Sequence, residues 1–366
     1  MDAAHSTMDS SLPMMGANSR SGLDSIELRQ MVRGMEACLR TLSGASILLT
    51  GATGWFGVWL LEALCAADDM LRLGIRITAV SRDPERFTAR FPRFGDDPRI
   101  RWIKTDIRQL EPVFGGFSHV IHAATDTSLQ SERDAPGQLF DTIVQGAHRA
   151  ITAAGTQCKG FLLLSSGAVY GPARENCERF VERAPGESDP SSLKDAYARG
   201  KNAAEQICAA AADNGLPVRI ARCFAFVGPH MPFDKHFAIG NFIADAVERR
   251  VIRVKSDGRP LRSYLYMTDL VRALVAILAG GAGVKPYNVG SDAALTIEQL
   301  ARCVDRVAGG RGVTIEGVPS DPRDRYIPDT TRLRVELGCA PEIALDTAVA
   351  RTAAWYRAQK NKSMPS

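Results

Sequence analysis

Short apolar runs alternate with amphipathic stretches along most of this chain, and glycine, proline or charged residues separate them. Short runs rich in Val, Ile and Leu are typical of buried strands, and three- to four-residue apolar spacing is typical of helices. The expected strands are 46–50, 77–80, 100–103, 120–124, 161–166, 218–221 and 287–289. Strands and helices that alternate in this way predict an α/β fold with a doubly wound parallel sheet.

The first residues have a different character. Residues 1–23 are rich in Ser, Met and Gly without periodicity, which predicts a disordered leader. Asp24 and Glu27 then resemble a capping box, and apolar residues follow at mixed three- and four-residue spacing up to Gly44. We therefore expect a helix over 24–43, packed outside the sheet or on a partner subunit and without a catalytic role.

Two later segments interrupt the alternation. Both are punctuated by Pro and Gly and have the mixed character of a small domain that covers a substrate. We expect a dinucleotide-binding domain over 44–227 and 264–292, and a smaller, discontinuous substrate-binding domain over 228–263 and 293–366.

Composition and charge exclude several classes of protein. The 366 residues are 45% hydrophobic and 23% charged, and the net charge of +4 is spread without Lys/Arg blocks, so a nucleic-acid partner is not expected. No apolar run is long enough to span a bilayer and no signal-peptide pattern begins the chain, so we expect a cytoplasmic protein without a membrane partner. The eight cysteines form no C-x-x-C pair, so neither a metal site nor a disulfide framework is expected.

A glycine-rich turn follows the first expected strand and opens a helix. Gly51 permits a tight turn, Gly54 lets a pyrophosphate approach the backbone, and Gly57 allows close packing of helix on strand. The helix N-terminus then offers free N–H groups and a positive dipole to phosphates. Other residues of the turn that we assign to the cofactor are Thr53, Trp55 and Phe56. The turn predicts a dinucleotide site in a Rossmann-type sheet.

The end of the second strand bears on the choice of cofactor. NAD enzymes usually have an acidic residue there that bonds the ribose hydroxyls. This chain has Ser81 and Arg82, and a hydroxyl with a guanidinium suits a 2′-phosphate, so we expect NADP(H). NAD(H) stays open, because Arg82 could merely pair with Asp83 and Asp83 could itself bond a ribose.

Tyr197 and Lys201 lie four residues apart on an expected helix, so their side chains share one face. The Lys201 ammonium can lower the pKa of the Tyr197 phenol. A tyrosine of this kind can exchange a proton with a sugar or alcohol hydroxyl while a nicotinamide exchanges the hydride. In combination with the glycine turn and the order of the elements between them, the pair predicts an oxidoreductase.

The order of these features resembles the extended short-chain dehydrogenase/reductase family, which includes nucleotide-sugar epimerases, dehydratases and ketoreductases. The resemblance covers about residues 44–357 and includes a Ser-Gly-Ala-Val-Tyr-Gly run at the end of the fifth strand. It implies that Ser166, four residues before Tyr170 in this run, hydrogen-bonds the reacting oxygen. Ser166, Tyr197 and Lys201 are therefore the expected catalytic residues.

The resemblance also implies contacts with the cofactor and the substrate. The cofactor contacts that it adds are Asp106 and Ile107 beside the adenine, and Ala123 and Ala124 along the pyrophosphate and nicotinamide ribose. His122 is expected to be structural. Arg262 and Arg325 resemble the arginines that bind the substrate diphosphate, for which planar cationic donors are suited.

Several positions depart from the family pattern. Gly167 and Ala168 stand where 4,6-dehydratases carry an Asp-Glu pair and where decarboxylases also use a carboxylate. Neither residue can move a proton, and elimination of water needs an acid and a base. Ala225 stands where family members often have an Asn that contacts the substrate. Thr142 stands where an Asn often supports the Tyr/Lys pair. The residues expected to shape the sugar pocket are Lys235, His236 and Asn241.

A reaction limited to hydride exchange at one carbon follows from these residues. We expect NADPH-dependent reduction of a 4-keto-6-deoxy nucleotide-diphosphate sugar by a homodimer. The alternative is an NAD-dependent 4-epimerase with a retained cofactor. A dehydratase, a decarboxylase and a non-catalytic cofactor-binding protein are less favoured, the last because a binder has no need of Ser166, Tyr197 and Lys201 together.

Overall fold

A seven-stranded sheet lies at the centre of the computed structural model, which describes residues 20–113, 115–125, 135–173, 177–182, 195–233, 237–318 and 324–363. The strand order is β11-β6-β5-β4-β1-β2-β3, and every pairing is parallel. The strands are β1 (Ser46–Thr50), β2 (Arg76–Ser81), β3 (Ile100–Lys104), β4 (His119–His122), β5 (Gly160–Ser166), β6 (Val218–Cys223) and β11 (Tyr287–Val289). The predicted doubly wound parallel sheet is confirmed. The expected strand at 120–124 ends early, because Ala123 and Ala124 leave the sheet to bond the Thr50 side chain.

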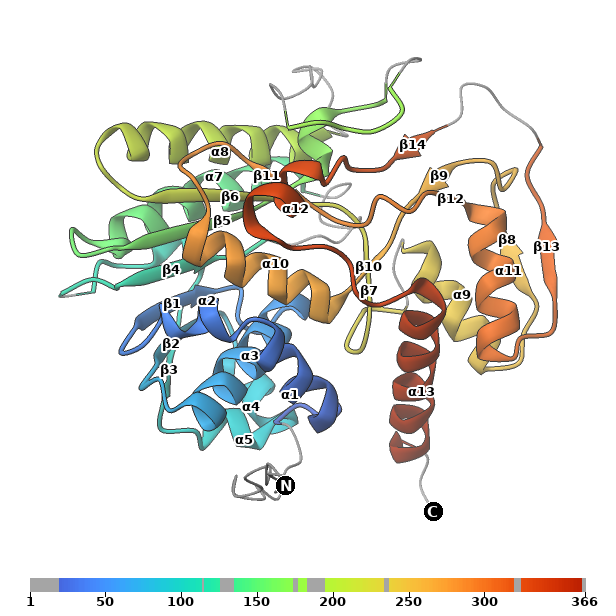
Figure 1. Ribbon diagram of the computed structural model, residues 1–366, viewed down its shortest axis with the longest axis horizontal. Coiled ribbons are helices and arrows are strands. Elements are labelled where there is room, and N and C mark those ends of the chain that lie inside the picture. Colours follow the sequence, from blue (N-terminus) through green and yellow to red (C-terminus); the bar gives the residue numbers. More distant parts are fainter. Residues whose placement is uncertain are drawn as a thin grey trace, which may run out of the picture.

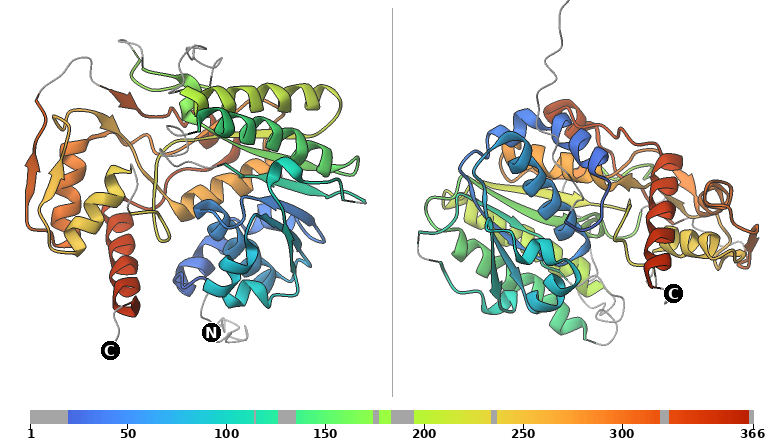
Figure 2. Two further views of the ribbon diagram at one scale, coloured as in Figure 1. Left: turned by 180° about the vertical axis from the view of Figure 1, so that it is seen from behind. Right: turned by 90° about the horizontal axis from the view of Figure 1, so that it is seen from below.

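Helices cover both faces of this sheet (Figures 1 and 2). Apolar side chains of α7 (Pro136–Ala154) and α8 (Ala196–Asp213) pack on one face, and those of α3 (Trp55–Leu71) and α10 (Met267–Gly280) on the other. The short elements beside them are α4 (Pro84–Arg90), α5 (Pro92–Gly95), η1 (Ile107–Gln109) and η2 (Gly167–Tyr170). Alternate residues of the central strands, such as those of β5, enter the two cores, as a sheet buried on both sides requires.

A second lobe with its own core lies beside the sheet (Figure 1). Its helices are α9 (Ala238–Val247), α11 (Ile297–Ala308) and α13 (Leu345–Ser363). Its strands are β7 (Phe226–Val227) with β10 (Leu265–Tyr266), β8 (Ile252–Val254) with β13 (Val313–Ile315), and β9 (Leu261–Arg262) with β12 (Leu295–Thr296) and β14 (Arg325–Tyr326). One helix within 293–366, α12 (Thr331–Leu337), instead contacts β11 and α10 of the sheet lobe.

The N-terminal region forms two helices where the sequence predicts one. They are α1 (Ser25–Gly34) and α2 (Glu36–Arg40), and Met35 between them has non-helical φ and ψ of −127° and 18°. Both pack on α10 and on α3. Asp24 accepts hydrogen bonds from the Ile26 and Glu27 N–H groups at 2.7 and 3.1 Å.

Contacts fix this region to the rest of the protein. Ser21, which the sequence assigns to the leader, donates its hydroxyl to the Glu62 carboxylate at 2.6 Å. Glu27 does not complete a capping box, because its carboxylate accepts from Arg351 of α13 at 2.6 Å and from the Tyr266 hydroxyl at 3.2 Å. The α1 helix therefore connects the sheet lobe with the second lobe.

None of the helices in the described ranges is both long and apolar enough to cross a membrane. Among the same residues, no cluster of His, Cys, Asp and Glu is arranged to hold a metal ion. The eight cysteines are free thiols.

Candidate active site

The three predicted catalytic residues come from neighbouring elements of the sheet lobe. Ser166 ends β5, and its hydroxyl accepts the Ala168 N–H at 3.1 Å, which caps η2. Tyr197 and Lys201 lie in the first turns of α8, which packs against β5. The Lys201 ammonium is 5.8 Å from the centre of the Tyr197 ring. The structure thus brings the expected Tyr/Lys pair together near the carboxyl end of β5.

Lys201 is buried beside this site. It is 4% exposed, and its Nζ donates to the Leu164 carbonyl at 2.7 Å and to the Thr125 hydroxyl at 2.8 Å. Burial lowers the pKa of its ammonium to about 8. Because an ammonium has three donors, one remains for a further acceptor.

A buried polar network supports the strand end from behind. Ser165 donates its hydroxyl to Glu205 at 2.5 Å, and Glu205 forms a two-pronged ion pair with Arg222 at 3.0 and 2.7 Å. The Arg222 guanidinium lies over the Tyr170 ring, 4.8 Å from its centre, and the Tyr170 hydroxyl donates to Asn288 at 2.8 Å. These contacts fix the backbone on either side of Ser166, and they give Tyr170 a structural role.

The glycine turn has the shape that a pyrophosphate needs. Gly51 has a φ of +70°, and a Cβ there would lie 2.6 Å from the Ala123 carbonyl oxygen. A Cβ at Gly57 would lie 2.3 Å from the Gly51 carbonyl oxygen, so this position needs a glycine for close packing. A Cβ at Gly54 would lie 3.3 Å from the Gly51 carbonyl oxygen, which is a tight contact, and Gly54 caps the 17-residue helix α3 without any side-chain hydrogen bond. The N-terminus of α3 thus fits an anion.

Two side chains of the turn point to the second lobe. Trp55 donates its indole N–H to the Pro229 carbonyl at 2.8 Å, and Phe56 packs edge-on against Phe226 at 5.2 Å. Their backbone N–H groups, in the first turn of α3, are the ones available to a phosphate. Thr53 lies at the other side of the turn, with its hydroxyl 3.2 Å from that of Ser81.

The end of β4 is joined to the end of β1. His122 and Thr50 share a hydrogen bond of 2.8 Å, and the Ala123 and Ala124 N–H groups donate to the Thr50 hydroxyl at 3.2 Å. Burial, with a smaller effect of Lys201, lowers the pKa of His122 to about 3, so its ring is neutral. His122 therefore braces the strand ends.

Charged residues gather at the end of β2. Asp83 caps α4 by accepting the Arg86 N–H at 3.0 Å, so its carboxylate is engaged there. Arg82 is exposed and near enough to Asp106 to favour its ionised form. Arg108 donates to both Asp106 oxygens at 2.9 and 3.0 Å, and it is the main cause of the lowered Asp106 pKa. Ile107, expected beside the adenine, is 7% exposed and belongs to the core under α7.

The two predicted substrate arginines lie on adjacent strands of the second lobe. Arg262 of β9 forms an ion pair with Asp324 and donates to the Leu261 carbonyl at 2.9 Å. Arg325 of β14 is half-buried and pairs in register with Leu261. A diphosphate bound by Arg262 would have to compete with Asp324.

Residues 47–290 match the NAD dependent epimerase/dehydratase family. The chain belongs to this family. The resemblance read from the sequence is thereby confirmed.

Three proteins illustrate its relatives. The UDP-glucuronic acid decarboxylase 1 of Arabidopsis thaliana is 29% identical over 319 residues, which are 85% of this chain and 69% of that protein. The structure of dTDP-glucose 4,6-dehydratase from Streptomyces venezuelae with NAD bound has a TM-score of 0.74 and 24% identity, covering 87% of this chain and 98% of that one. The structure of UDP-glucose 4-epimerase from Thermotoga maritima with UDP-glucose has a TM-score of 0.71 and 18% identity, covering 86% of this chain and 99% of that one. The two structures establish the fold shared with this epimerase/dehydratase chain.

The structure also places some of the other positions that the sequence analysis named. The Thr142 hydroxyl bonds the Gln138 carbonyl of its own helix at 2.7 Å. Ala225 contributes its carbonyl to the Leu265 N–H at 3.0 Å. Lys235 and His236 lie outside the described residues, and Asn241 lies in the first turn of α9.

Two residues near the site were not singled out from the sequence. Thr125, which bonds Lys201, directly follows Ala123 and Ala124, and that position was its only signal. Tyr326 follows the predicted Arg325, and its hydroxyl lies beside Ser166 and Gly167. Its approach depends on the pairing of β14 with β9, which no local pattern shows.

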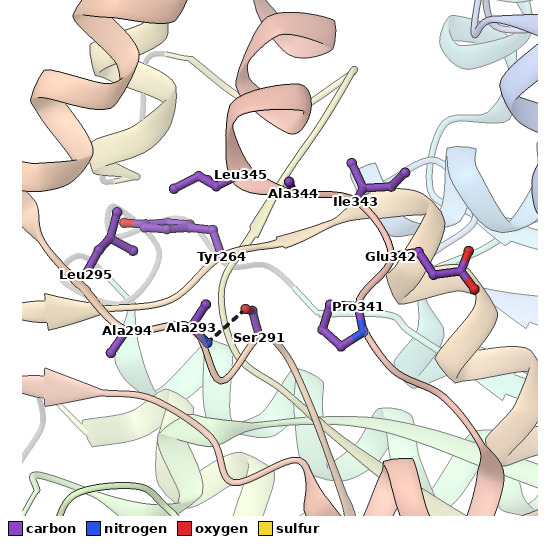
Figure 3. A pocket seen from close by; sticks show the side chains of 10 residues that line it. All are labelled: Tyr264, Ser291, Ala293, Ala294, Leu295, Pro341, Glu342, Ile343, Ala344 and Leu345. Carbon is purple, nitrogen blue, oxygen red and sulfur yellow. Dashed lines mark hydrogen bonds between the residues drawn. The ribbon is translucent and has the colours of Figure 1, made fainter.

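A separate cavity of about 350 Å³ lies in the second lobe of this epimerase/dehydratase chain (Figure 3). It is lined by Tyr264, Ser291, Ala293, Ala294, Leu295, Pro341, Glu342, Ile343, Ala344 and Leu345. None of the predicted catalytic, cofactor or diphosphate residues is among these. Its lining is mostly apolar.

Proposed function

We propose that this protein is a nucleotide-sugar oxidoreductase that exchanges a hydride at C4 of a hexose, and that it reduces a 4-keto-6-deoxy nucleotide sugar with NADPH. One observation supports this best. Tyr197, Lys201 and Ser166 are assembled at the carboxyl end of β5, while Gly167 and Ala168 beside them offer no acid or base.

Each residue has a role that follows from its surroundings. A nicotinamide bound at the glycine turn would supply the hydride. Tyr197 gives its phenolic proton to the C4 oxygen, and Ser166 donates a hydrogen bond to the same oxygen. Lys201, fixed by Leu164 and Thr125, keeps one N–H for the ribose of the cofactor and holds positive charge below Tyr197.

The substrate assignment rests on the arginines and on the relatives. Arg262 and Arg325 lie on neighbouring strands and suit a diphosphate. The relatives described above carry the names of enzymes that act on UDP- or dTDP-sugars. We propose that the second lobe, over 228–263 and 293–366, holds the nucleotide and the diphosphate.

The preference for NADPH rests on Arg82. Asp83, which could otherwise bond a ribose, accepts the Arg86 N–H as the cap of α4. Arg108 is paired with Asp106, whereas Arg82 is exposed at the end of β2. An exposed guanidinium at this position suits a 2′-phosphate.

A single experiment tests the reaction. The protein is incubated with NADPH or NADH and a panel of UDP- and dTDP-linked 4-keto-6-deoxy sugars and 4-hydroxy sugars, and nicotinamide absorbance and products are recorded. We expect one NADPH consumed per 4-keto sugar reduced, and no 4-keto-6-deoxy product from a parent hexose. Release of that product would overturn the claim that Gly167 and Ala168 exclude dehydration.

A second candidate is a 4-epimerase that retains NAD. The absence of an acid and a base at Gly167 and Ala168 supports this candidate too, and so does the fold shared with the Thermotoga 4-epimerase. An epimerase returns the hydride to the same sugar and consumes no cofactor. Interconversion of 4-epimers without added NADPH would therefore replace the reductase with the epimerase.

A further inference from the structure

A buried carboxylate joins the N-terminal helix to the second lobe. Glu27 of α1 is 7% exposed, and its carboxylate accepts from Arg351 of α13 at 2.6 Å and from the Tyr266 hydroxyl of β10 at 3.2 Å. The Arg351 guanidinium also lies over the Tyr266 ring, 5.7 Å from its centre. Both donors belong to the second lobe, and we call these three side chains the interlobe contact. Figure 1 shows α1 on the side of the sheet lobe that faces α13.

Each side of the interlobe contact is fixed in its own core. Apolar residues of α1 next to Glu27 are buried in the sheet lobe, and apolar residues of α13 next to Arg351 are buried in the second lobe. These residues are Leu28, Met31 and Val32 on α1, and Ala348, Val349 and Ala353 on α13. Because a close-packed core resists the displacement of a helix, neither helix can shift easily within its own lobe. The ion pair between them therefore fixes the position of one lobe relative to the other.

A short packed segment connects the interlobe contact with a predicted diphosphate ligand. Tyr266 follows Arg262 by four residues, and a segment of this length spans at most about 14 Å. Ser263 and Leu265 within it are buried. The Tyr266 ring also meets Trp59 of α3 edge-on at 6.1 Å, and the N-terminus of α3 is the predicted phosphate-binding turn. Tyr266 thus lies at the junction of the two halves of the proposed site.

The proposed site is divided between the two lobes. The sheet lobe provides the glycine turn and the predicted catalytic residues, and the second lobe provides Arg262 and Arg325. A nucleotide sugar bound as proposed has its diphosphate on one lobe and its C4 on the other. Such a ligand binds best when the lobes already have the right relative orientation, because binding otherwise has to order them at a cost in entropy.

We propose that α1 holds the second lobe in the orientation that the nucleotide sugar needs, and that Glu27 and Arg351 are positioning residues for this substrate. Both lie outside residues 47–290, the part of the chain that matches the family. They act through Tyr266 and the segment that leads from it to Arg262. This inference rests on the proposed function, since it uses a substrate that spans the two lobes.

The test compares ligands of one lobe with a ligand that spans both. Glu27→Gln removes the buried charge, and Arg351→Met removes its cationic partner. Both variants should lower kcat/KM for the nucleotide sugar that the panel identifies by about 10-fold, because misplacing reacting groups by about 1 Å can cost up to about 100-fold. NADPH binds the sheet lobe alone, and UDP or dTDP binds the second lobe alone. The Kd values of these ligands, measured by calorimetry, should be unchanged.

Three further variants separate positioning from stability. Ser21→Ala removes the buried hydrogen bond to Glu62, which lies within the sheet lobe, so it should lower the urea midpoint and leave kcat/KM unchanged. Arg351→Lys keeps a cation beside Glu27 and should lose less kcat/KM than Arg351→Met. The double variant Glu27→Gln/Arg351→Met should lose no more than the worse single variant, because both residues act through one contact. Arg351 is partly exposed, so its variants carry the test even if Glu27→Gln does not fold.

The outcomes distinguish this inference from the function on which it rests. If the wild type turns over no nucleotide sugar, the proposed function is overturned and the inference with it. If the wild type is active and the Glu27 and Arg351 variants keep its kcat/KM, or weaken NADPH and UDP or dTDP by as large a factor, only the positioning role is overturned. An equal fall in kcat/KM for Ser21→Ala would overturn that role too, because loss of stability alone would then explain the result.

Discussion

Lys201 should make the stability of this protein depend on pH in a way that a single substitution reveals. The pKa of its ammonium falls from the ordinary 10.5 to about 8 because the group is buried. At about 1.4 kcal/mol per pH unit, this difference corresponds to about 3 kcal/mol of unfolding free energy. Below about pH 8 the folded and unfolded chains are both protonated at Lys201. Burial of the charged ammonium then lowers the unfolding free energy by this full amount.

The sign follows from proton binding. Between about pH 8 and 10.5 the unfolded chain binds more protons at Lys201 than the folded chain, so stability rises with pH. Lys201→Met cannot be protonated and removes this dependence. Between about pH 7 and about pH 9.5, the wild type should gain about 2 kcal/mol relative to Lys201→Met. The hydrogen bonds to Leu164 and Thr125 that the variant loses shift its stability but do not create this slope.

Urea unfolding of the two proteins without cofactor, followed by circular dichroism at both pH values, measures the difference. Lys255→Met is the control, because Lys255 is exposed after β8 and its replacement should give no comparable change with pH. A difference between wild type and Lys201→Met that stays constant, or that moves against the wild type as pH rises, would refute the account of a buried ammonium.

The remaining predictions concern the site and the N-terminal region. Tyr197→Phe should lower turnover by about 100-fold or more while cofactor binding, measured by fluorescence titration, is retained; unchanged turnover would end the catalytic assignment. Arg82→Ala should weaken NADPH binding by about 1.5 to 3 kcal/mol and spare NADH, and an equal effect on both cofactors would refute the 2′-phosphate contact. Glu27→Gln should lower the unfolding free energy in urea by about 1 to 2 kcal/mol, because Glu27 is buried against Arg351. Glu36→Gln, at an exposed pair on α2, should cost at most about 0.5 kcal/mol, and equal effects of the two substitutions would contradict a stabilising role for the buried Glu27–Arg351 contact.

The sheet could be predicted because its signals are local. A run such as 161–166 is apolar throughout, since both faces of a central parallel strand are covered, and β5 (Gly160–Ser166) differs from it by one residue. The glycine turn could also be predicted from the sequence, because the positive φ of Gly51 and the crowding at Gly57 are requirements of one short segment. The ends of the elements were harder to predict. Ala123 and Ala124 continue an apolar run in the sequence, but in the structure their N–H groups donate to the Thr50 hydroxyl.

Contacts between distant segments could not be read in the same way. The spacing of Asp24 and Glu27 suggested a capping box, but the Glu27 carboxylate bonds Arg351, far along the chain. Arg262 was assigned to the substrate diphosphate from the sequence, and the structure gives it Asp324 as a partner. A charged side chain's partner depends on which elements meet in space, and local periodicity contains no information about that.

Gly167 shows how a missing group should be interpreted. From the sequence, its lack of a side chain is only the loss of an acid that related dehydratases use. In the structure, the vacated volume holds the Tyr326 hydroxyl, delivered by a strand of the other lobe. Proton-transfer chemistry beside Ser166 therefore cannot return by adding a carboxylate at position 167 alone, because that side chain would collide with Tyr326 and Phe224. On the proposed function, the restriction to hydride exchange therefore depends on Gly167 together with the Tyr326 and Phe224 side chains that occupy the space beside it.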